Sequence, residues 1–471
     1  MIGALARNLQ QALAASGSIL CDASGAERSA AELVSHAHQV AALLKQADTG
    51  AHEPVHLVID NRPLDVASLL GIWLAGAVAV PIHATAVEAT RQLLAAKTGA
   101  RFLIDGDEIE RLAEEPPAPR ALWNGVALVI FTSGTTGTPK GVVLGHDALA
   151  GKIAVLKSLL GLKVDDTVLV PLQLNFIFGL WICLLAIECG SRIVLLAKFS
   201  ADVAGQWLDD GATVLGAVPT MLRTLLAGPV PQARTLRMIL AGGEVMTPSL
   251  NEAISRVWPH AGIFDLYGST ETGSCDFCLT PSEQIGGRGS IGHPTRGVKF
   301  RITASDGRLA QEGEAGELEI DTPYGMLGYL DDPGLTRASF NENYFRTGDL
   351  ARIRADKRTE IVGRAKEIIS RGGNKISPLE IDNLLSAHPD VAVALCTGIP
   401  DERLGETIQA IAVLKRGATL SESDLLAWAS GKIERYKLPE AIIFCDAIPV
   451  GSTGKASRAA VAQFILARQQ E

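Results

Sequence analysis

Short apolar runs alternate with helix-like segments over the first three-quarters of the chain, and this alternation limits the possible folds more than any other feature. The runs typical of buried strands are "VHLVID" (55–60), "GAVAVPI" (76–82), "RFLID" (101–105), "ALVIFT" (127–132), "SRIVLL" (191–196), "ATVLGAVP" (212–219) and "LRMILAGGE" (236–244). Strands that alternate with helices form largely parallel sheets with helices on their faces. The sequence therefore predicts an α/β protein.

The pattern changes twice toward the C-terminus. Between residues 286 and 350, short strand-like segments are separated by Gly and Asp, which favours a smaller β-rich section. After "EIVGRAKEIISRGGNKISP" (360–378), helix-like and strand-like segments form a compact α+β pattern. We expect a large N-terminal domain of helix-covered sheets plus a β-rich section, a boundary near Arg364, and a small α+β C-terminal domain.

Composition excludes several classes of protein. The chain has 471 residues, of which 47% are hydrophobic and 20% charged, and its net charge is −9. This composition is typical of a soluble globular protein, and the acidic balance disfavours nucleic acid as a partner. The cysteines are scattered and odd in number, which predicts reduced thiols in a cytoplasmic protein rather than a disulfide framework.

An uncharged stretch from Thr167 to Ile187 is long enough to cross a bilayer. Pro171, Gln173, Asn175 and Gly179 interrupt it, however. A strand followed by a turn and a buried helix explains the stretch better than a membrane span does. We therefore expect no membrane-spanning segment.

The segment "FTSGTTGTPKGVV" (131–143) predicts a phosphate-binding loop. Glycines let backbone N–H groups approach a ligand, Ser and Thr add hydroxyl donors, and Lys140 supplies a positive charge. The apolar run before the loop would hold it at the end of a sheet, where α/β proteins bind ligands. The segment is not a P-loop, because Lys140 follows Pro139 and Gly141 stands where that motif has Ser or Thr.

Further motifs follow in order along the chain. They are "DLYGSTETG" (265–273), "YFRTGDL" (344–350), "VGRAKEIISRGGNKISPLEI" (362–381) and "PVGSTGKASR" (449–458). Together with the loop, they resemble the adenylate-forming superfamily of acyl-CoA synthetases, adenylation domains and luciferases. The resemblance implies a large N-terminal α/β domain of two helix-covered β-sheets plus a β-rich subdomain, and a small mobile α+β C-terminal domain. Each motif alone is equally typical of a helix cap, a salt bridge or a solvated lysine; the specificity comes from the ordered set.

The resemblance implies a reaction in which a carboxylate attacks the α-phosphorus of ATP, and this reaction needs cations and aimed donors. Thr270 would donate to the α-phosphate, Glu271 would hold Mg²⁺, and Lys140 would lie over the β- and γ-phosphates. Asp349 would accept hydrogen bonds from both ribose hydroxyls, and Arg364 would reach the same ribose. The other nucleotide-binding residues implied by the resemblance are Thr132, Ser133, Gly134, Thr135, Thr136, Gly242, Gly243, Glu244, Asp265, Tyr267 and Gly268.

The resemblance also implies a second half-reaction that needs domain rotation. Lys455 would bridge the carboxylate and the α-phosphate during adenylation. The mobile C-terminal domain (367–471) would then turn against the large domain (1–363) about a hinge at 364–366, which includes Lys366, and withdraw that lysine. The pantetheine arm of coenzyme A would pass close to Arg371, Gly372, Gly373 and Lys375.

The acyl pocket is predicted from fewer residues. Phe176 stands where family members often have a histidine, and Asn175 precedes it. Amino-acid-activating members of the family usually have an aspartate nearby, whereas Asn175 carries no charge to pair with a substrate ammonium, so an amino acid is disfavoured as substrate. Asn followed by an aromatic is similar to aryl-acid-activating members of the family, and this resemblance hints at an aryl acid. Plain core packing explains the same pair equally well. The other residues expected to line the pocket are Val218, Pro219, Gly268, Gly273 and Ser274.

The resulting hypothesis is an ATP- and Mg²⁺-dependent carboxylic acid–CoA ligase that works through an acyl-adenylate, as a monomer or homodimer. Its acid is expected to be aryl or aliphatic and to lack an amino group. A stand-alone adenylation enzyme that loads a carrier-protein phosphopantetheine in trans fits the sequence equally. A catalytically silent nucleotide-binding relative is a third alternative, which the presence of Lys140, Glu271, Asp349, Arg364 and Lys455 disfavours.

Overall fold

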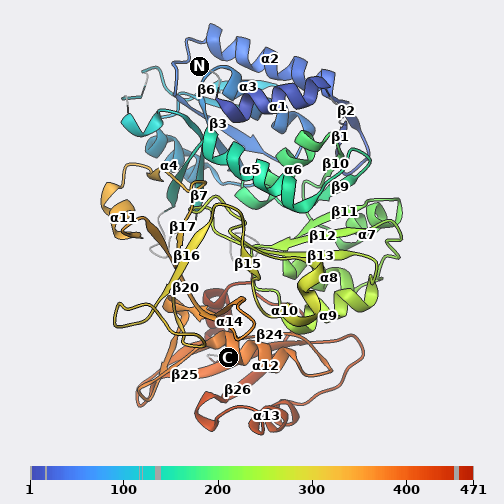
Figure 1. Ribbon diagram of the computed structural model, residues 1–471, viewed down its shortest axis with the longest axis vertical. Helices are drawn as coiled ribbons and strands as arrows, with labels where there is room; N and C mark the ends of the chain where they lie inside the picture. The colour runs from blue at the N-terminus through green and yellow to red at the C-terminus, as the bar shows by residue number, and fades with distance from the viewer. Residues whose placement is uncertain are drawn as a thin grey trace.

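The computed structural model describes residues 3–15, 19–115, 117–118, 120–132, 139–449 and 456–469. Within these ranges the chain forms several β-sheets with helices packed against them (Figure 1). The N-terminal helices and the C-terminal sheet lie at opposite ends of the molecule (Figure 1).

The largest sheet is mostly parallel. In spatial order its strands are β15 (His293–Pro294), β14 (Phe277–Leu279), β13 (Gly262–Tyr267), β12 (Met238–Gly242), β11 (Val214–Ala217), β9 (Thr167–Val170), β10 (Arg192–Leu195), β1 (Ile19–Cys21) and β2 (Glu27–Ser29). Strands β9 to β13 and β1 pair in parallel, and the antiparallel pairs occur only toward the two edges. The carboxyl ends of the parallel strands therefore meet along one edge of the sheet.

A second sheet lies beside the first and carries the phosphate-loop hairpin. Its strands are, in spatial order, β18 (Gly328–Tyr329), β8 (Lys140–Gly145), β7 (Val126–Thr132), β4 (Val78–His83), β3 (Pro54–Ile59), β5 (Phe102–Asp105) and β6 (Glu108–Arg111). Strands β7 and β8 are antiparallel, and Thr132 pairs with Lys140 at the end of their ladder. The predicted loop thus begins and ends on adjacent strands of one hairpin.

A layer of helices packs between these two sheets. It contains α1 (Ala4–Ala15), α2 (Ala30–Gln46), α3 (Pro63–Leu74), α5 (His146–Leu160) and α6 (Ile177–Cys189), whose apolar side chains share one core with both sheets. The start of α2 is fixed by a capping box between Ser29 and Glu32. The other face of the largest sheet is covered by α7 (Ala201–Asp209), α8 (Pro219–Ala227) and α9 (Pro248–Val257).

Two smaller sheets follow toward the C-terminus, with shorter helices around them. The β-rich section contains β16 (Lys299–Thr303), β17 (Gly316–Asp321), β19 (Phe340–Asn341), β20 (Tyr344–Ile353) and β21 (Thr359–Arg364). The last sheet contains β22 (Ile369–Arg371), β23 (Asn374–Ile376), β24 (Val391–Asp401), β25 (Gly405–Leu414) and β26 (Ala441–Phe444). The remaining helices are α4 (Glu88–Thr98), α10 (Gln284–Gly287), α11 (Pro333–Ala338), α12 (Pro378–Ser386), α13 (Glu422–Ser430) and α14 (Arg458–Gln469).

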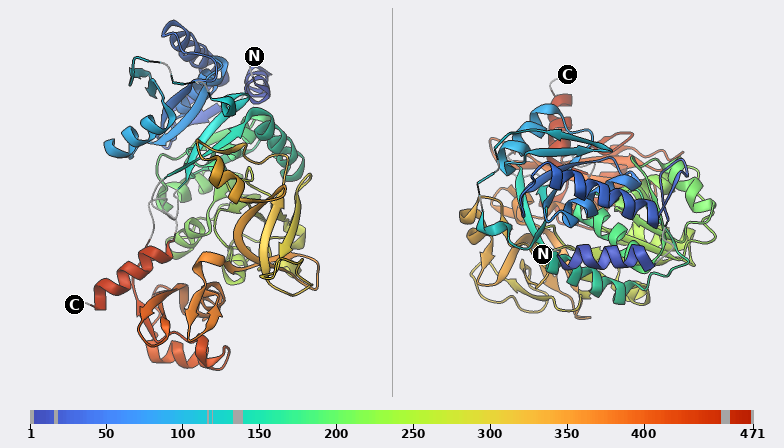
Figure 2. Two further views of the ribbon diagram at one scale, coloured as in Figure 1. Left: turned by 90° about the vertical axis from the view of Figure 1, so that its left-hand side faces the viewer. Right: turned by 90° about the horizontal axis from the view of Figure 1, so that it is seen from above.

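The chain changes sheets close to the expected domain boundary. Strand β21 ends at Arg364 in the β-rich section, a single 3₁₀ turn follows at Ala365–Glu367, and β22 opens the last sheet at Ile369. Helices α12 and α13 pack on the last sheet, while α14 packs across its other face and carries the C-terminus (Figure 2). The boundaries 1–363, 364–366 and 367–471, and the rotation about them, stay predictions.

The predicted fold class is confirmed: two helix-covered sheets, a β-rich section and a small α+β unit are all present. The uncharged stretch from Thr167 to Ile187 folds as β9 and the buried helix α6. Across the described ranges, no helix is both long enough and apolar enough for a membrane span. Strands β1 and β2 and helix α14 were not predicted.

Acid is expected to destabilise the fold through His56, which is fully buried on β3. Its Nε2 lies 2.8 Å from Thr98 Oγ1, and burial lowers its pKa to about 4. The unfolded chain binds this proton near pH 6.5, so stability is lost as the pH falls from 6.5 toward 4. Between pH 7 and pH 5, the loss of unfolding free energy measured in urea should be about 2 kcal/mol smaller in His56→Gln than in the wild type. The exposed His38→Gln control should behave like the wild type; an equal loss in His56→Gln would contradict the assignment.

Candidate active site

The carboxyl ends of β12 and β13 bring together the residues predicted to line the adenine slot. Gly242 on β12 pairs with Leu266 on β13, so Gly243 and Glu244 lie beside Tyr267. Gly242 has no room for a side chain, because a Cβ would lie 2.6 Å from the carbonyl oxygen of Leu266. The Glu244 carboxylate caps α8, whose Thr220 donates to it from the backbone N–H and the hydroxyl at 3.0 and 2.8 Å. This edge is where open α/β sheets bind ligands.

Asp349, Tyr267 and Arg364 converge from three strands. Asp349 on β20 is buried and pairs in register with Arg364 on β21. The Tyr267 hydroxyl donates to Asp349 Oδ2 at 2.6 Å, and Arg364 Nε donates to Oδ1 at 2.6 Å. Burial and the Asp349 carboxylate raise the pKa of Tyr267 well above its usual value, so the phenol keeps its proton. Each carboxylate oxygen retains a second lone pair for another donor.

Asp265 is the second buried carboxyl group in this region. It lies two residues before Tyr267 on β13, and therefore on the same face of the strand. Burial raises its pKa to about 8. At neutral pH the group is mostly protonated, so it can both donate and accept a hydrogen bond.

Lys140 and Glu271 are linked through Tyr329, a residue that the sequence analysis did not select. The Tyr329 hydroxyl donates to Glu271 Oε1 at 3.0 Å, and Lys140 Nζ lies 5.5 Å from the centre of the Tyr329 ring. Lys97 on α4 donates to the carbonyl oxygen of Pro139 at 2.9 Å and so fixes the residue before Lys140. A cation and a carboxylate, predicted from motifs far apart in the sequence, thus lie at one tyrosine side chain, the cation over its ring and the carboxylate at its hydroxyl.

Thr270 and Glu271 lie on a tight turn between β13 and β14. Two glycines are required in it: a Cβ on Gly268 would lie 2.4 Å from the backbone nitrogen of Cys275, and a Cβ on Gly273 would lie 2.2 Å from the Tyr324 carbonyl oxygen. Thr270 and Glu271 are both half-buried. The predicted residues Ser133, Gly134, Thr135, Thr136 and Lys455 lie outside the described residues.

Comparisons with known proteins identify the family. The family model described as "AMP-binding enzyme" matches residues 10–124 and 106–330, and the model for the C-terminal domain of AMP-binding enzymes matches residues 380–455. The chain belongs to the AMP-binding enzyme family. The predicted membership of the adenylate-forming superfamily, and of the acid–thiol ligases within it, is confirmed.

Two curated relatives and one solved structure are similar over most of this AMP-binding enzyme. The "Probable CoA ligase CCL9" of Humulus lupulus is 31% identical over 443 residues, which cover 91% of this chain and 82% of the relative. The "Fatty acid–[acyl-carrier-protein] ligase ScoC" of Streptomyces coeruleorubidus is 32% identical over 432 residues, which cover 83% and 82%. The ATP-bound crystal structure of MatB from Rhodopseudomonas palustris superposes with a TM-score of 0.84 at 25% identity, covering 97% and 98%.

In this AMP-binding enzyme the residues predicted for the acyl pocket occupy three segments. Val218 and Pro219 follow β11 at the same sheet edge as the adenine slot, and Gly273 and Ser274 lie on the neighbouring turn. Asn175 and Phe176 immediately precede α6 and are half-buried. Phe178, which was not predicted, reaches the slot from α6: a Cβ on Gly242 would lie 3.0 Å from its Cζ atom. The acyl pocket stays a prediction.

The predicted coenzyme A segment is a β-hairpin. Gly372 and Gly373 form its turn with φ of +56° and +84°, the pair of left-handed residues that a tight hairpin favours. Arg371 is held within its own domain, because it donates to the carbonyl oxygen of Tyr436 at 2.8 Å and pairs with Glu440 at 2.6 Å.

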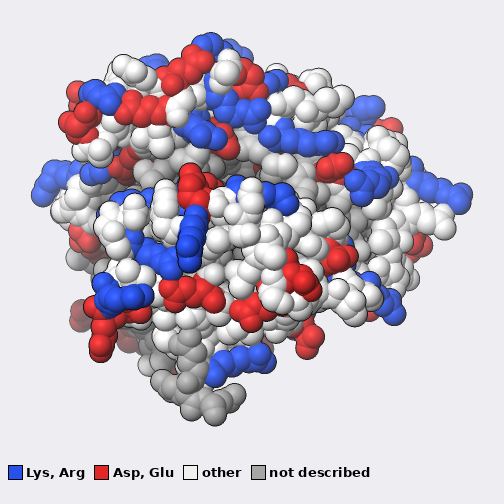
Figure 3. All heavy atoms as spheres, turned by 90° about the horizontal axis from the view of Figure 1, so that it is seen from below, with Lys and Arg blue, Asp and Glu red and all other residues white. Residues whose placement is uncertain are grey.

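Two basic side chains between β20 and β21 form ion pairs with acidic neighbours. Lys357 pairs with Glu312, and Arg358 pairs with Asp356 at 3.0 Å. The lower face of the molecule likewise shows basic and acidic side chains interspersed (Figure 3).

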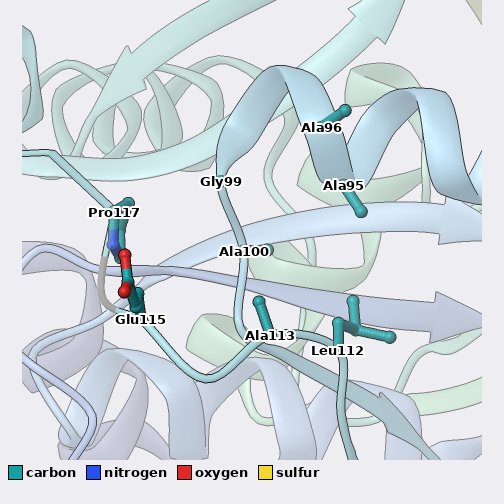
Figure 4. A pocket seen from close by; sticks show the side chains of 8 residues that line it. All are labelled: Ala95, Ala96, Gly99, Ala100, Leu112, Ala113, Glu115 and Pro117. Atoms are coloured by element: carbon teal, nitrogen blue, oxygen red, sulfur yellow. The ribbon is translucent and has the colours of Figure 1, made fainter.

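A cavity of about 340 Å³ lies between the end of α4 and the segment after β6, and none of the predicted site residues is among those that line it (Figure 4). Its lining consists of Ala95, Ala96, Gly99, Ala100, Leu112, Ala113, Glu115 and Pro117. Small apolar side chains and one carboxylate provide no attraction for a triphosphate, so we do not assign the nucleotide to this cavity.

Proposed function

We propose that this protein is an ATP- and Mg²⁺-dependent carboxylic acid–CoA ligase that acts through an enzyme-bound acyl-adenylate. The observation that carries the proposal is that the turn after β13 connects the Asp349 cluster, which contains Tyr267, to the Lys140–Tyr329–Glu271 contact. A buried carboxylate with hydrogen-bonded partners suits a ribose. A cation beside a single carboxylate suits a triphosphate with its metal.

The metal site fits Mg²⁺ better than a metal held by protein alone. The parts of the chain that the structure describes hold no group of three or more His, Cys, Asp or Glu that could bind an ion. Mg²⁺ typically takes one or two carboxylates and completes its shell with phosphate oxygens and water, and Glu271 would supply the protein ligand. When bound, the ion would neutralise the charge that develops on the phosphate oxygens.

The residues of the chain would have separate roles in binding the nucleotide and in the reaction. Tyr267 and the edge of β12 would hold the adenine, and Asp349 with Arg364 would hold the ribose. Thr270 would donate to the α-phosphate while the substrate carboxylate forms an O–P bond and pyrophosphate leaves. Lys455 would stabilise that transition state. A thiolate would next attack the acyl carbon, and AMP would leave.

The acid is proposed to be aryl or aliphatic and to lack an amino group. The Asn175 side-chain oxygen is buried and has no hydrogen-bond partner among the described residues. A neutral amide oxygen at this position could accept a hydrogen bond from a hydroxyl group of a substrate. It could not balance an ammonium in full, because a buried charge needs an opposite charge.

Loading of a carrier protein is the second candidate, because one of the two relatives above is named as an acyl-carrier-protein ligase. The deciding experiment measures pyrophosphate release with ATP and Mg²⁺ over a panel of aryl and aliphatic acids, with and without coenzyme A. Turnover that requires coenzyme A and yields acyl-CoA supports the ligase. A single slow equivalent of pyrophosphate, unaffected by coenzyme A, supports the carrier-protein enzyme. No release with any acid would contradict both.

Asp349→Ala is expected to weaken ATP binding by at least about 100-fold, because hydrogen bonds to a charged acceptor contribute about 1.5–3 kcal/mol each. Titration calorimetry with ATP and with 3′-deoxy-ATP measures the effect. The wild type should prefer ATP, whereas the variant should bind both nucleotides equally weakly. Asp321→Ala is the control, since Asp321 pairs with Lys299 on the β-rich sheet. Retention of the preference for ATP in Asp349→Ala would contradict the ribose assignment.

A further inference from the structure

The turn that carries Thr270 and Glu271 is held in an unfavourable backbone conformation. Gly273, Ser274 and Cys275 are consecutive left-handed residues, with φ of +80°, +67° and +53°. A left-handed conformation is unfavourable for a residue with a side chain and persists only where the surroundings enforce it. Something must therefore hold this turn in place from outside.

Lys152 on α5, in the helical layer that packs against the turn, stabilises this conformation. Its side chain is 2% exposed, and its Nζ donates to the carbonyl oxygen of Cys275 at 3.2 Å and to Asp276 Oδ1 at 3.3 Å. The ammonium also lies 4.8 Å from the centre of the Tyr324 ring. The charge of Lys152 is thus directed at the left-handed segment and the residue that follows it.

Asp276 connects Lys152 to the part of the turn that contains Glu271. Its side chain is fully buried, and its second carboxylate oxygen accepts a hydrogen bond from the Thr272 hydroxyl. The same hydroxyl accepts from the backbone N–H of Ser269 at 3.2 Å. The network therefore reaches the residues on both sides of Thr270 and Glu271.

We propose that Lys152 is a positioning residue for adenylation, which fixes the turn bearing Thr270 and Glu271 through its buried ion pair with Asp276. This proposal rests on the proposed function, because it gives Thr270 and Glu271 their roles at the α-phosphate and the metal. Burial alone does not account for the pair. Replacing a buried ion pair by apolar side chains is often neutral or stabilising, so stability is a weak reason for a lysine here.

The test compares two matched double variants. Lys152→Met with Asp276→Asn removes both charges of the proposed positioning pair. Arg101→Met with Glu53→Gln removes another buried ion pair, whose side chains are 6% and 3% exposed, on the second sheet. The single variant Lys152→Met is included because it leaves a buried carboxylate unpaired, and its thermal midpoint should fall below that of the matching double variant.

For the Lys152/Asp276 double variant, kcat for pyrophosphate release should fall about 100-fold, since a small misplacement of reacting groups has effects of this size. The KM for ATP should change less than about threefold, because the ribose contacts are intact. The thermal shift that Mg²⁺ adds to the shift from ATP alone should also disappear. The Arg101/Glu53 variant should keep its kcat and its Mg²⁺-dependent shift, whatever happens to its thermal midpoint.

A Lys152/Asp276 double variant with the kcat and the Mg²⁺-dependent shift of the wild type would overturn the positioning role while leaving the proposed function intact. Equal losses of kcat in both double variants would also overturn it, because the effect would then follow from losing any buried ion pair. A wild-type protein with no ATP-dependent thermal shift and no pyrophosphate release would instead contradict the proposed function, and the role of Lys152 with it.

Discussion

Lys455→Ala is expected to lower the rate of adenylate formation by about 100- to 1,000-fold, the loss that follows removal of one transition-state donor. The reaction brings a substrate carboxylate to a charged phosphate, and Lys455 is the cation expected to lie between them. Pyrophosphate release in a single turnover measures this half-reaction. Thioester formation from supplied acyl-adenylate should stay near the wild-type rate, because the rotated domain would have withdrawn the lysine.

The control for this experiment is Lys432→Ala, another lysine of the C-terminal unit. Lys432 lies over the ring of Trp428 with its Nζ 3.5 Å from the ring centre, and it has no assigned role in the reaction. Both half-reactions should be unchanged in this variant. If Lys455→Ala slowed both half-reactions equally, the account with two domain orientations would be wrong.

The sequence predicted the parallel sheets well, because a buried strand leaves a local signal. The apolar run 127–132 became β7 almost residue for residue, and β12 lies within the run 236–244. Strand β1 was missed because it has only three residues, Ile19–Cys21, and its strand conformation depends on pairing with the rest of the sheet. Helix α14 was missed because the role of its apolar residues, such as Val461 and Ile465, depends on the sheet on which they pack, and the sequence alone does not show that contact.

In the candidate site, too, residues with a local sequence signal were predicted and residues that depend on distant partners were not. Tyr267, Asp349 and Arg364 were selected from their motifs, and the structure brings all three into hydrogen-bonding contact. Tyr329 and Lys152 were not selected, because their importance comes from partners that are distant in the sequence. A tyrosine after a glycine, or a lysine in an amphipathic helix, has no local feature that distinguishes it from surface or core residues. Burial of a lysine's charge becomes visible only once the fold is known.

The segment that follows Lys455 is fixed by a second buried charge, Arg458, at the start of α14. Arg458 donates to Asp382 Oδ2 at 2.5 Å, to Glu367 Oε2 at 2.7 Å and to the carbonyl oxygen of Cys396 at 2.6 Å. Its side chain is 16% exposed and that of Asp382 only 6%. Burial raises the pKa of Asp382, and Arg458 opposes that rise. One guanidinium thus joins α14, α12, β24 and the 3₁₀ turn that contains the predicted hinge lysine.

Arg458→Met is therefore expected to destabilise the C-terminal unit by about 3–5 kcal/mol, because it leaves the Asp382 carboxylate buried without a cation. Hydrogen exchange of the β24 and β25 amides, followed as urea is raised, measures this unit separately from the rest of the chain. Arg468→Met is the matched control on the same helix: Arg468 is exposed and stacks over Phe464, so its loss should change stability by less than about 1 kcal/mol. Adding Asp382→Asn to Arg458→Met should restore part of the loss, since the unpaired charge is then removed as well. Equal small effects in the two single variants would show that the Arg458 network does not hold this unit together.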